Sequence, residues 1–302
     1  MAFATGKEST EGGVVKRYVG VAPVFVIAVN PDKKTLESIY NTNLDKTPEY
    51  IGEREVGLEG NKTKVPQVRL DFIVKTDSEK CGIEMISKVS FFLAKEPRYN
   101  KDRSKVQVIN KYGETTWLSL EDAKAKRVPD NLSWFEPADF RPAYTGEEEV
   151  TAFIKAYLNI PNKSYRKANG EVVELADKSE AEARLDNIEK YFKGDFSELN
   201  AVIALQPKNK VKCLFGVKSV NEKQYQDVFL QKFLKNNVSD YSKLEAEVMD
   251  RKNNGSYPST EFFVNNKIVD IQEYSVDATN LDAKPVDDDL PFGDNGTPWF
   301  ND

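Results

Sequence analysis

Basic and aromatic side chains are interleaved in one stretch of the chain, residues 88–118. From Lys95 to Lys111 there are six basic residues and two acidic ones, and aromatic rings occur before, among and after them. Cations of this kind neutralise phosphates and exposed rings stack on bases, so the mixture is typical of a surface that binds single-stranded nucleic acid. The simpler alternative is a solvated hairpin whose rings face a core. For any single residue, this alternative is the more common case.

Strand alternation separates the two interpretations for two rings. If Val89, Phe91 and Leu93 point inward, Phe92 points outward and lies on a polar face. By the same rule Trp117 lies opposite Leu118 and is displayed. The candidate nucleic-acid contacts in this stretch are Phe92, Arg98, Tyr99, Lys101, Arg103, Lys105, Tyr112 and Trp117.

A second group of bases lies between Lys208 and Lys235, where seven lysines accompany two acidic residues. Alternation across 210–220 places Cys213 among core residues and predicts that three lysines lie on the opposite face. Lysine on an exposed strand also guards a sheet edge against pairing, and the two interpretations have about equal weight. The candidate phosphate contacts here are Lys210, Lys212 and Lys218.

Composition excludes most catalytic classes. The chain has no histidine and two cysteines, Cys81 and Cys213, so it lacks the commonest general base and cannot build a four-ligand zinc site from nitrogen and sulfur. The usual glycine-rich phosphate-binding motifs are also missing. We therefore expect no enzymatic reaction, no cofactor and no metal, although a magnesium-dependent nuclease or polymerase accessory built on converging carboxylates is a third alternative.

The net charge of the chain is concentrated at its end. Residues 277–302 contain seven aspartates and one lysine, a net charge of −6. Subtracting them from the 43 basic and 49 acidic residues of the chain leaves 42 of each. Such a segment cannot form a core, and we expect a disordered interaction tail. Its candidate partner-binding residues are Asp287, Asp288, Asp289, Leu290, Pro291, Phe292, Trp299 and Phe300.

The periodicity predicts an α+β protein, an antiparallel OB-like β-barrel with a helical insertion at about 128–198. We expect a flexible arm at 1–15, a nucleic-acid-binding body at 16–276 and the acidic tail at 277–302. Thr145 and Ser242 each precede a Glu by three residues, and these patterns predict capping boxes. The expected strands are 18–29, 66–76, 83–95, 105–112, 115–120, 199–207, 210–220, 224–234 and 260–274. The expected helices are 120–127, 146–158, 178–192 and 242–251, with a hairpin turning at 169–170.

The sequence "DDDLPF" at 287–292 resembles the acidic tip of bacterial and bacteriophage single-stranded-DNA-binding proteins. The order of "KVKCLFGVKSV", "QYQDVFLQKFL", a short helix and an acidic tail is also similar to phage members of that family. The resemblance implies an OB-fold that holds DNA and a tail that docks replication or recombination proteins. The family tip usually ends the chain, whereas here "TPWFND" lies further on as a second candidate tip.

We therefore expect a sequence-nonspecific single-stranded-DNA-binding protein, encoded by a phage and acting in the bacterial cytoplasm in DNA replication or recombination. The alternative from another class is a virion structural or assembly protein whose tail docks into a neighbouring subunit. No apolar run is long enough for a membrane-spanning helix, so no membrane partner is expected.

Overall fold

The computed structural model describes most of the chain between Lys16 and Tyr274. The described residues are 16–57, 62–110, 113–132, 135, 140–158, 165–166, 172–173, 188–197, 199–200, 209–220, 223–255, 260–261 and 267–274. The predicted arm at 1–15, the tail at 277–302 with its eight candidate partner-binding residues, and Tyr112 lie outside them.

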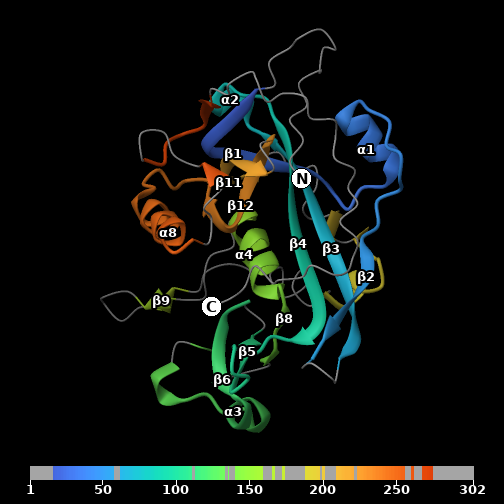
Figure 1. Cartoon of the computed structure of the whole chain (residues 1–302). Coiled ribbons are helices and arrows are strands. Elements are labelled where there is room, and N and C mark those ends of the chain that lie inside the picture. Colours follow the sequence, from blue (N-terminus) through green and yellow to red (C-terminus); the bar gives the residue numbers. More distant parts are fainter. Residues whose placement is uncertain are drawn as a thin grey trace.

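A curled, mostly antiparallel sheet forms the main body (Figure 1). Within the described residues it has nine strands, and its central path runs β12-β11-β1-β3-β4-β8. Strands β14, β2 and β13 pair with β1, β3 and β11, respectively. The strands are β1 (Arg17–Val29), β2 (Ile51–Val56), β3 (Thr63–Thr76), β4 (Ile86–Pro97), β8 (Tyr144–Thr145), β11 (Val211–Val220), β12 (Lys223–Lys235), β13 (Thr260–Glu261) and β14 (Gln272–Tyr274).

Strand β3 shows why the sequence forms this sheet. It covers the strand predicted at 66–76, and its alternating residues from Val68 to Val74 are buried on the concave face. The intervening Asp71 and Ile73 are also buried, because helix α1 (Lys33–Tyr40) covers part of the outer face through Leu36. The buried carboxylate of Asp71 is paired with Arg69 at 3.2 Å and with Lys88 at 3.6 Å. A strand buried on both faces keeps such a charge only when it is paired.

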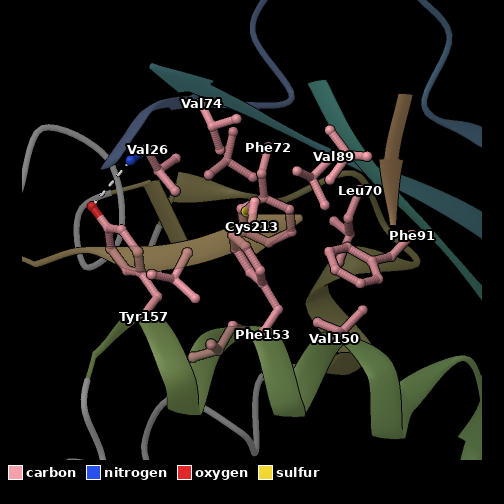
Figure 2. Close-up of a cluster of buried hydrophobic side chains, with 14 of the residues drawn as sticks. Val26, Leu70, Phe72, Val74, Val89, Phe91, Val150, Phe153, Tyr157 and Cys213 are labelled. Carbon is pink, nitrogen blue, oxygen red and sulfur yellow. Dashed lines mark hydrogen bonds between the residues drawn. The ribbon is translucent and has the colours of Figure 1, made fainter. Parts of the chain in front are cut away.

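Helix α4 (Glu147–Tyr157) fills the concave side of the sheet (Figure 2). Its Val150, Phe153 and Tyr157 point into the strands, where Phe153 lies 4.6 Å from Phe72 and 4.8 Å from Phe233, between ring centroids. Phe233 of β12 is also 5.8 Å from Phe91 of β4. The two ends of the central path therefore curl toward each other around the helix, and the body is a half-barrel.

The same helix supplies a hydrogen-bond acceptor to the edge of β1 that has no partner strand. Strand β11 pairs with β1 only as far as Val24. Beyond that point, the Val26 N–H donates to the Tyr157 hydroxyl at 3.2 Å, and the Val29 N–H donates to the Asn200 side chain at 3.0 Å. Buried backbone donors need such partners, so α4 and the segment around Asn200 replace the missing strand.

A second, three-stranded sheet in the order β6-β5-β7 forms a small lobe, at the lower end of Figure 1. Its elements are β5 (Lys105–Ile109), β6 (Thr115–Ser119), α3 (Leu120–Ala125), η1 (Asp130–Leu132) and β7 (Arg141–Pro142). The lobe has a core of its own, which consists of Val106, Val108, Leu118, Phe135 and Phe140.

Helix α8 (Ser242–Asn253) covers the outer face of β11. Its Leu244 and Val248 form a cluster with Leu214 of that strand. Cys213, on the concave face, is buried as predicted, and burial raises the pKa of its thiol.

Both predicted capping boxes are wrong. The N-cap of α4 is Gly146, at a φ of 85°, and the Thr145 hydroxyl donates instead to the Glu96 carbonyl. The N-cap of α8 is Tyr241, and the Ser242 hydroxyl donates to Asp240. In both cases the hydroxyl finds an acceptor outside the helix.

Several smaller expectations can be compared with the structure. Strands β9 (Tyr165–Arg166) and β10 (Val172–Val173) pair on either side of the predicted turn at 169–170. Residues 199–200 are helical, contrary to the strand predicted at 199–207, and 201–208 lie outside the described residues. Of the helix predicted at 178–192, α6 (Ile188–Tyr191) is described. In the range of the strand predicted at 260–274, the described residues contain two short strands, β13 and β14, and 262–266 lie outside them. Helices α1 and α2 (Ser78–Cys81) and strand β2 were not predicted.

The fold class is therefore α+β, a mostly antiparallel curled half-barrel with a few helices, which confirms the coarser part of the prediction. The segment 128–198, predicted as an insertion, contains the helix that fills the half-barrel. Over the described part of the chain, no helix combines the length and the apolar character needed to cross a membrane.

Candidate nucleic-acid interface

The register of the small sheet displays Trp117. In the β5–β6 pair Trp117 lies opposite Gln107, and Ser119 lies opposite Lys105. Directly opposed residues share a face. We call this side the Trp117 face; it consists of Lys105, Gln107, Ile109, Thr115, Trp117 and Ser119. Trp117 is 36% exposed, whereas Leu118 on the other side is 1% exposed, as the alternation predicted.

Arg98 lies beside the Trp117 ring. It follows the end of β4, and its guanidinium carbon is 5.8 Å from the ring centroid, which is within the range of a cation–π contact. The same guanidinium donates to Glu148 at 2.8 Å and to Glu149 at 3.1 Å. Arg98, predicted as a phosphate contact, is thus also bound to two carboxylates of the first turn of α4.

The turn at 99–105 carries three further predicted contacts. The Asn100 side chain accepts a hydrogen bond from the Lys105 N–H at 2.8 Å, which closes the turn. Arg103 adopts a left-handed conformation with a φ of 57°, and its side chain is 46% exposed, 4.0 Å from a Glu96 oxygen. Lys101 and Lys105 are exposed. The turn therefore presents three cations next to one end of the Trp117 face.

Tyr99 does not share the Trp117 face. It bridges to Val106, whose side chain lies in the core of the small lobe, and it packs against that core. The Arg103 guanidinium carbon is 4.4 Å from the centroid of its ring. The two predicted stacking rings of this region thus lie on opposite sides of the small sheet.

Phe92 is displayed as predicted but lies on the main sheet. It is 51% exposed, while Phe91 is 4% exposed. Its cross-strand neighbour is Arg69 on β3. Five residues, with an irregular register between Ala94 and Pro97, separate Phe92 from Arg98. Phe92 and Trp117 therefore belong to different sheets.

Lys212 and Lys218 of β11, together with Lys210 immediately before it, are separate from the small lobe. We call these three the lysines of β11. In Figure 1, β11 lies in the upper half of the molecule and β5 and β6 lie at its lower end. Lys210 is paired with Asp77 at 2.5 Å. Lys212 donates to the Val238 carbonyl at 2.6 Å and to the Tyr241 hydroxyl at 3.0 Å, at the start of α8. Lys218 is near Asp227, where burial raises the pKa of the carboxyl and the charge of Lys218 opposes that rise.

The groups that surround Arg98 were not predicted from the sequence. Gln107 on β5 donates to Glu148 at 2.7 Å, and Thr115 on β6 donates to it at 3.0 Å. The acidic run Glu147-Glu148-Glu149 suits the first turn of a helix, whose dipole favours negative charge, and that pattern does not indicate these partners. Alternation along β5 and β6 could have placed Gln107 and Thr115 beside Trp117, but no local signal connects them to a glutamate in another part of the chain.

Among the described residues, no group of three or more cysteine, aspartate or glutamate side chains is arranged to hold a metal ion. The carboxylates of the α4 N-terminus are bound instead by Arg98 and Arg141, with Arg141 at 2.6 Å from Glu147. These ion pairs connect the small lobe to α4 and thus to the half-barrel.

Comparison with known proteins found no family model, no curated protein and no solved structure that matches this chain.

Proposed function

We propose that this protein binds single-stranded DNA without sequence specificity, through the Trp117 face and the turn at 99–105. The observation that carries the proposal is the exposed Trp117 ring, backed by the Arg98 guanidinium and flanked by Lys105 on the same face. An exposed ring beside cations stacks on unpaired bases of any sequence, because every base has a flat face. No catalytic step is part of the proposal.

Phosphates contact the cations of the turn, which are Lys101, Arg103 and Lys105. Arg98 acts on the ring rather than on the phosphates, since Glu148 and Glu149 offset its charge. Phe92 and the three lysines of β11 are outside the proposed contact surface, because they lie elsewhere on the molecule and the side chains of Lys210 and Lys212 contact other parts of the protein.

For the finer fold class we infer an OB-like barrel. The support for it is the approach of β12 to β4 at Phe233 and Phe91, which brings the first strand of the central path close to the strand before its last one, around α4. For partners, we propose that the acidic tail recruits replication or recombination proteins. The support is its sequence, in which Leu290, Pro291 and Phe292 follow three aspartates. An acidic peptide with an apolar tip fits a pocket with a basic rim.

A titration of fluorescently labelled oligothymidylate at several salt concentrations tests the proposed function. We expect binding at low salt that weakens as salt rises, and Trp117→Ala should weaken it by about 1 to 3 kcal/mol. The double variant Lys101→Ala/Lys105→Ala should lower the slope of log K against log salt by about 0.7 for each phosphate contact removed.

The control is Lys62→Ala/Lys64→Ala, which removes two exposed lysines of the β2–β3 region that pair with Glu55 and Glu53. It removes the same charge from another part of the molecule, and the slope of log K against log salt should stay nearly unchanged. Absence of binding at low salt, or binding that does not depend on salt, would refute the proposal.

A further inference from the structure

Glu148 connects three segments that meet at Trp117. Its carboxylate accepts hydrogen bonds from Arg98 after β4 at 2.8 Å, from Gln107 on β5 at 2.7 Å and from Thr115 on β6 at 3.0 Å. Both carboxylate oxygens accept hydrogen bonds. Thr115 donates to Oε1, and Arg98 and Gln107 donate to Oε2. A carboxylate with three donors on separate segments has little freedom to turn.

Arg98 is fixed by the same network. Besides Glu148, it donates to Glu149 at 3.1 Å and to the Gln107 side-chain oxygen at 3.2 Å. Its side chain is only 21% exposed. The planar guanidinium is thus held in one orientation, with its carbon 5.8 Å from the centroid of the Trp117 ring. The ring has a rigid, charged support on its inner side, while part of it is exposed to solvent.

We propose that Glu148 is a positioning residue for nucleic-acid binding, an inference that rests on the proposed function. By holding Arg98 against Trp117, it fixes the ring in the orientation in which a base stacks on it. A ring that is already ordered loses less conformational entropy when the base arrives. Glu148 therefore strengthens the binding of a polyanion although it carries a negative charge itself.

The sign of this effect distinguishes positioning from simple electrostatics. If Glu148 acted only through its charge, its neutralisation would strengthen nucleic-acid binding, because a repulsive charge is removed. Under the positioning role, Glu148→Gln weakens binding by about two- to tenfold, the range expected when one immobilised side chain becomes free. The salt slope should stay nearly unchanged, because no phosphate contact is lost.

Glu121→Gln is the matched control. Glu121 lies on α3 in the same lobe, and its side chain is 85% exposed. Its neutralisation removes the same charge near the same surface without touching the Arg98 network. We expect binding that is unchanged or slightly tighter.

The experiment measures oligothymidylate binding and Trp117 fluorescence in a Trp134→Phe/Trp299→Phe background, where Trp117 is the only one of the three tryptophans left. Without DNA, Glu148→Gln should lower the fluorescence anisotropy of Trp117 and shift its emission, and Glu121→Gln should do neither. In a Trp117→Ala protein with its other tryptophans intact, Glu148→Gln should have no further effect on binding, because it acts through the ring.

If Glu148→Gln does not fold, Thr115→Val tests the same network, since it removes one donor to Glu148 and keeps the side-chain volume. Binding that is equal or tighter in the folded variant, with unchanged Trp117 fluorescence, would overturn the positioning role. A protein that binds no oligothymidylate refutes the proposed function, and with it the role in binding, whereas the fluorescence without DNA still shows whether Glu148 holds the ring.

Discussion

Gly146 brings the chain into α4 against the backbone of β4. Its φ is 85°, and a Cβ atom at this position would lie 1.9 Å from the Phe92 carbonyl oxygen. Gly255, after α8, has a similar φ of 82°, and a Cβ there would meet nothing within 4 Å. The two glycines therefore separate the cost of the backbone conformation from the cost of a clash.

We predict that Gly255→Ala lowers the free energy of unfolding by about 1 to 2 kcal/mol, the cost of a left-handed conformation for an L-residue. Gly146→Ala should cost more than this, because the backbone of β4 must also move. Urea unfolding of the two variants measures the difference. If the two variants lost the same free energy of unfolding, the contact between Gly146 and β4 would not be tight.

Tyr157 is the second residue with a testable local role. We predict that Tyr157→Phe lowers the free energy of unfolding by about 1 to 3 kcal/mol, because the Val26 N–H then loses its acceptor in a buried position. The ring stays in place, so little packing is lost. Chemical denaturation checks the value, and a variant as stable as the wild type would show that water or another group accepts the bond.

At the scale of residues, the exposure of Phe92 and Trp117 could be predicted because alternation in a strand depends only on neighbouring residues. The partners of Arg98 could not be predicted. Glu148 is 50 positions away in the chain, and nothing in either local sequence specifies the meeting.

At the scale of elements, the first turn of α4 connects the small lobe to the half-barrel through three consecutive glutamates. Glu147 is bound by Arg141 of β7, and Glu148 and Glu149 are bound by Arg98. Burial raises the pKa of Glu149, although the charge of Arg98 opposes the rise. This carboxylate therefore binds its proton more tightly in the folded protein than in the unfolded chain.

The sign of the resulting pH dependence follows from that shift. The extra stability is present below the unfolded pKa, about 4.5, and is lost as the pH rises through the folded value. We predict that the wild type loses stability relative to Glu149→Gln as the pH rises above about 4.5. Urea unfolding of both proteins from pH 4 to pH 8 measures the difference. A difference that does not change with pH would contradict the prediction.

The long elements could be predicted from sequence because each of their patterns extends over ten or more residues. Strands β1, β3, β11 and β12 and helices α4 and α8 lie close to their expected ranges. The capping boxes failed because the same Ser or Thr pattern also satisfies other acceptors, and the φ of Gly146 depends on the tight contact with β4. Helix α1 has eight residues and strand β2 has six, so each offers only a short pattern, and neither was predicted.

At the scale of the molecule, the two groups of basic residues lie in the small lobe and on the outer side of β11, and the net negative charge lies in the tail. The sequence predicted the charge of the tail but not the separation of the two basic groups, because their relative position depends on how the sheet curls around α4. The proposed interface uses the first group only.

We predict that deletion of residues 277–302 strengthens oligothymidylate binding at low salt, because it removes a net charge of −6. The gain should shrink as salt rises and screens the charges. A full-length variant with the seven tail aspartates changed to asparagine separates charge from chain length and should show the same gain. Unchanged affinity at low salt in both proteins would contradict the prediction.

The most direct measurement of single-strand binding at Trp117 is photo-crosslinking of an oligonucleotide that contains 5-iodouracil, followed by mass spectrometry of the linked peptide. Halogenated bases link to rings that stack on them, so the crosslink identifies the stacking residue. We predict that the dominant crosslink lies on Trp117 and that it disappears in Trp117→Ala at the same low salt concentration. A dominant crosslink on Phe92 or on the β11 side of the molecule, or none at all, would contradict the proposed interface.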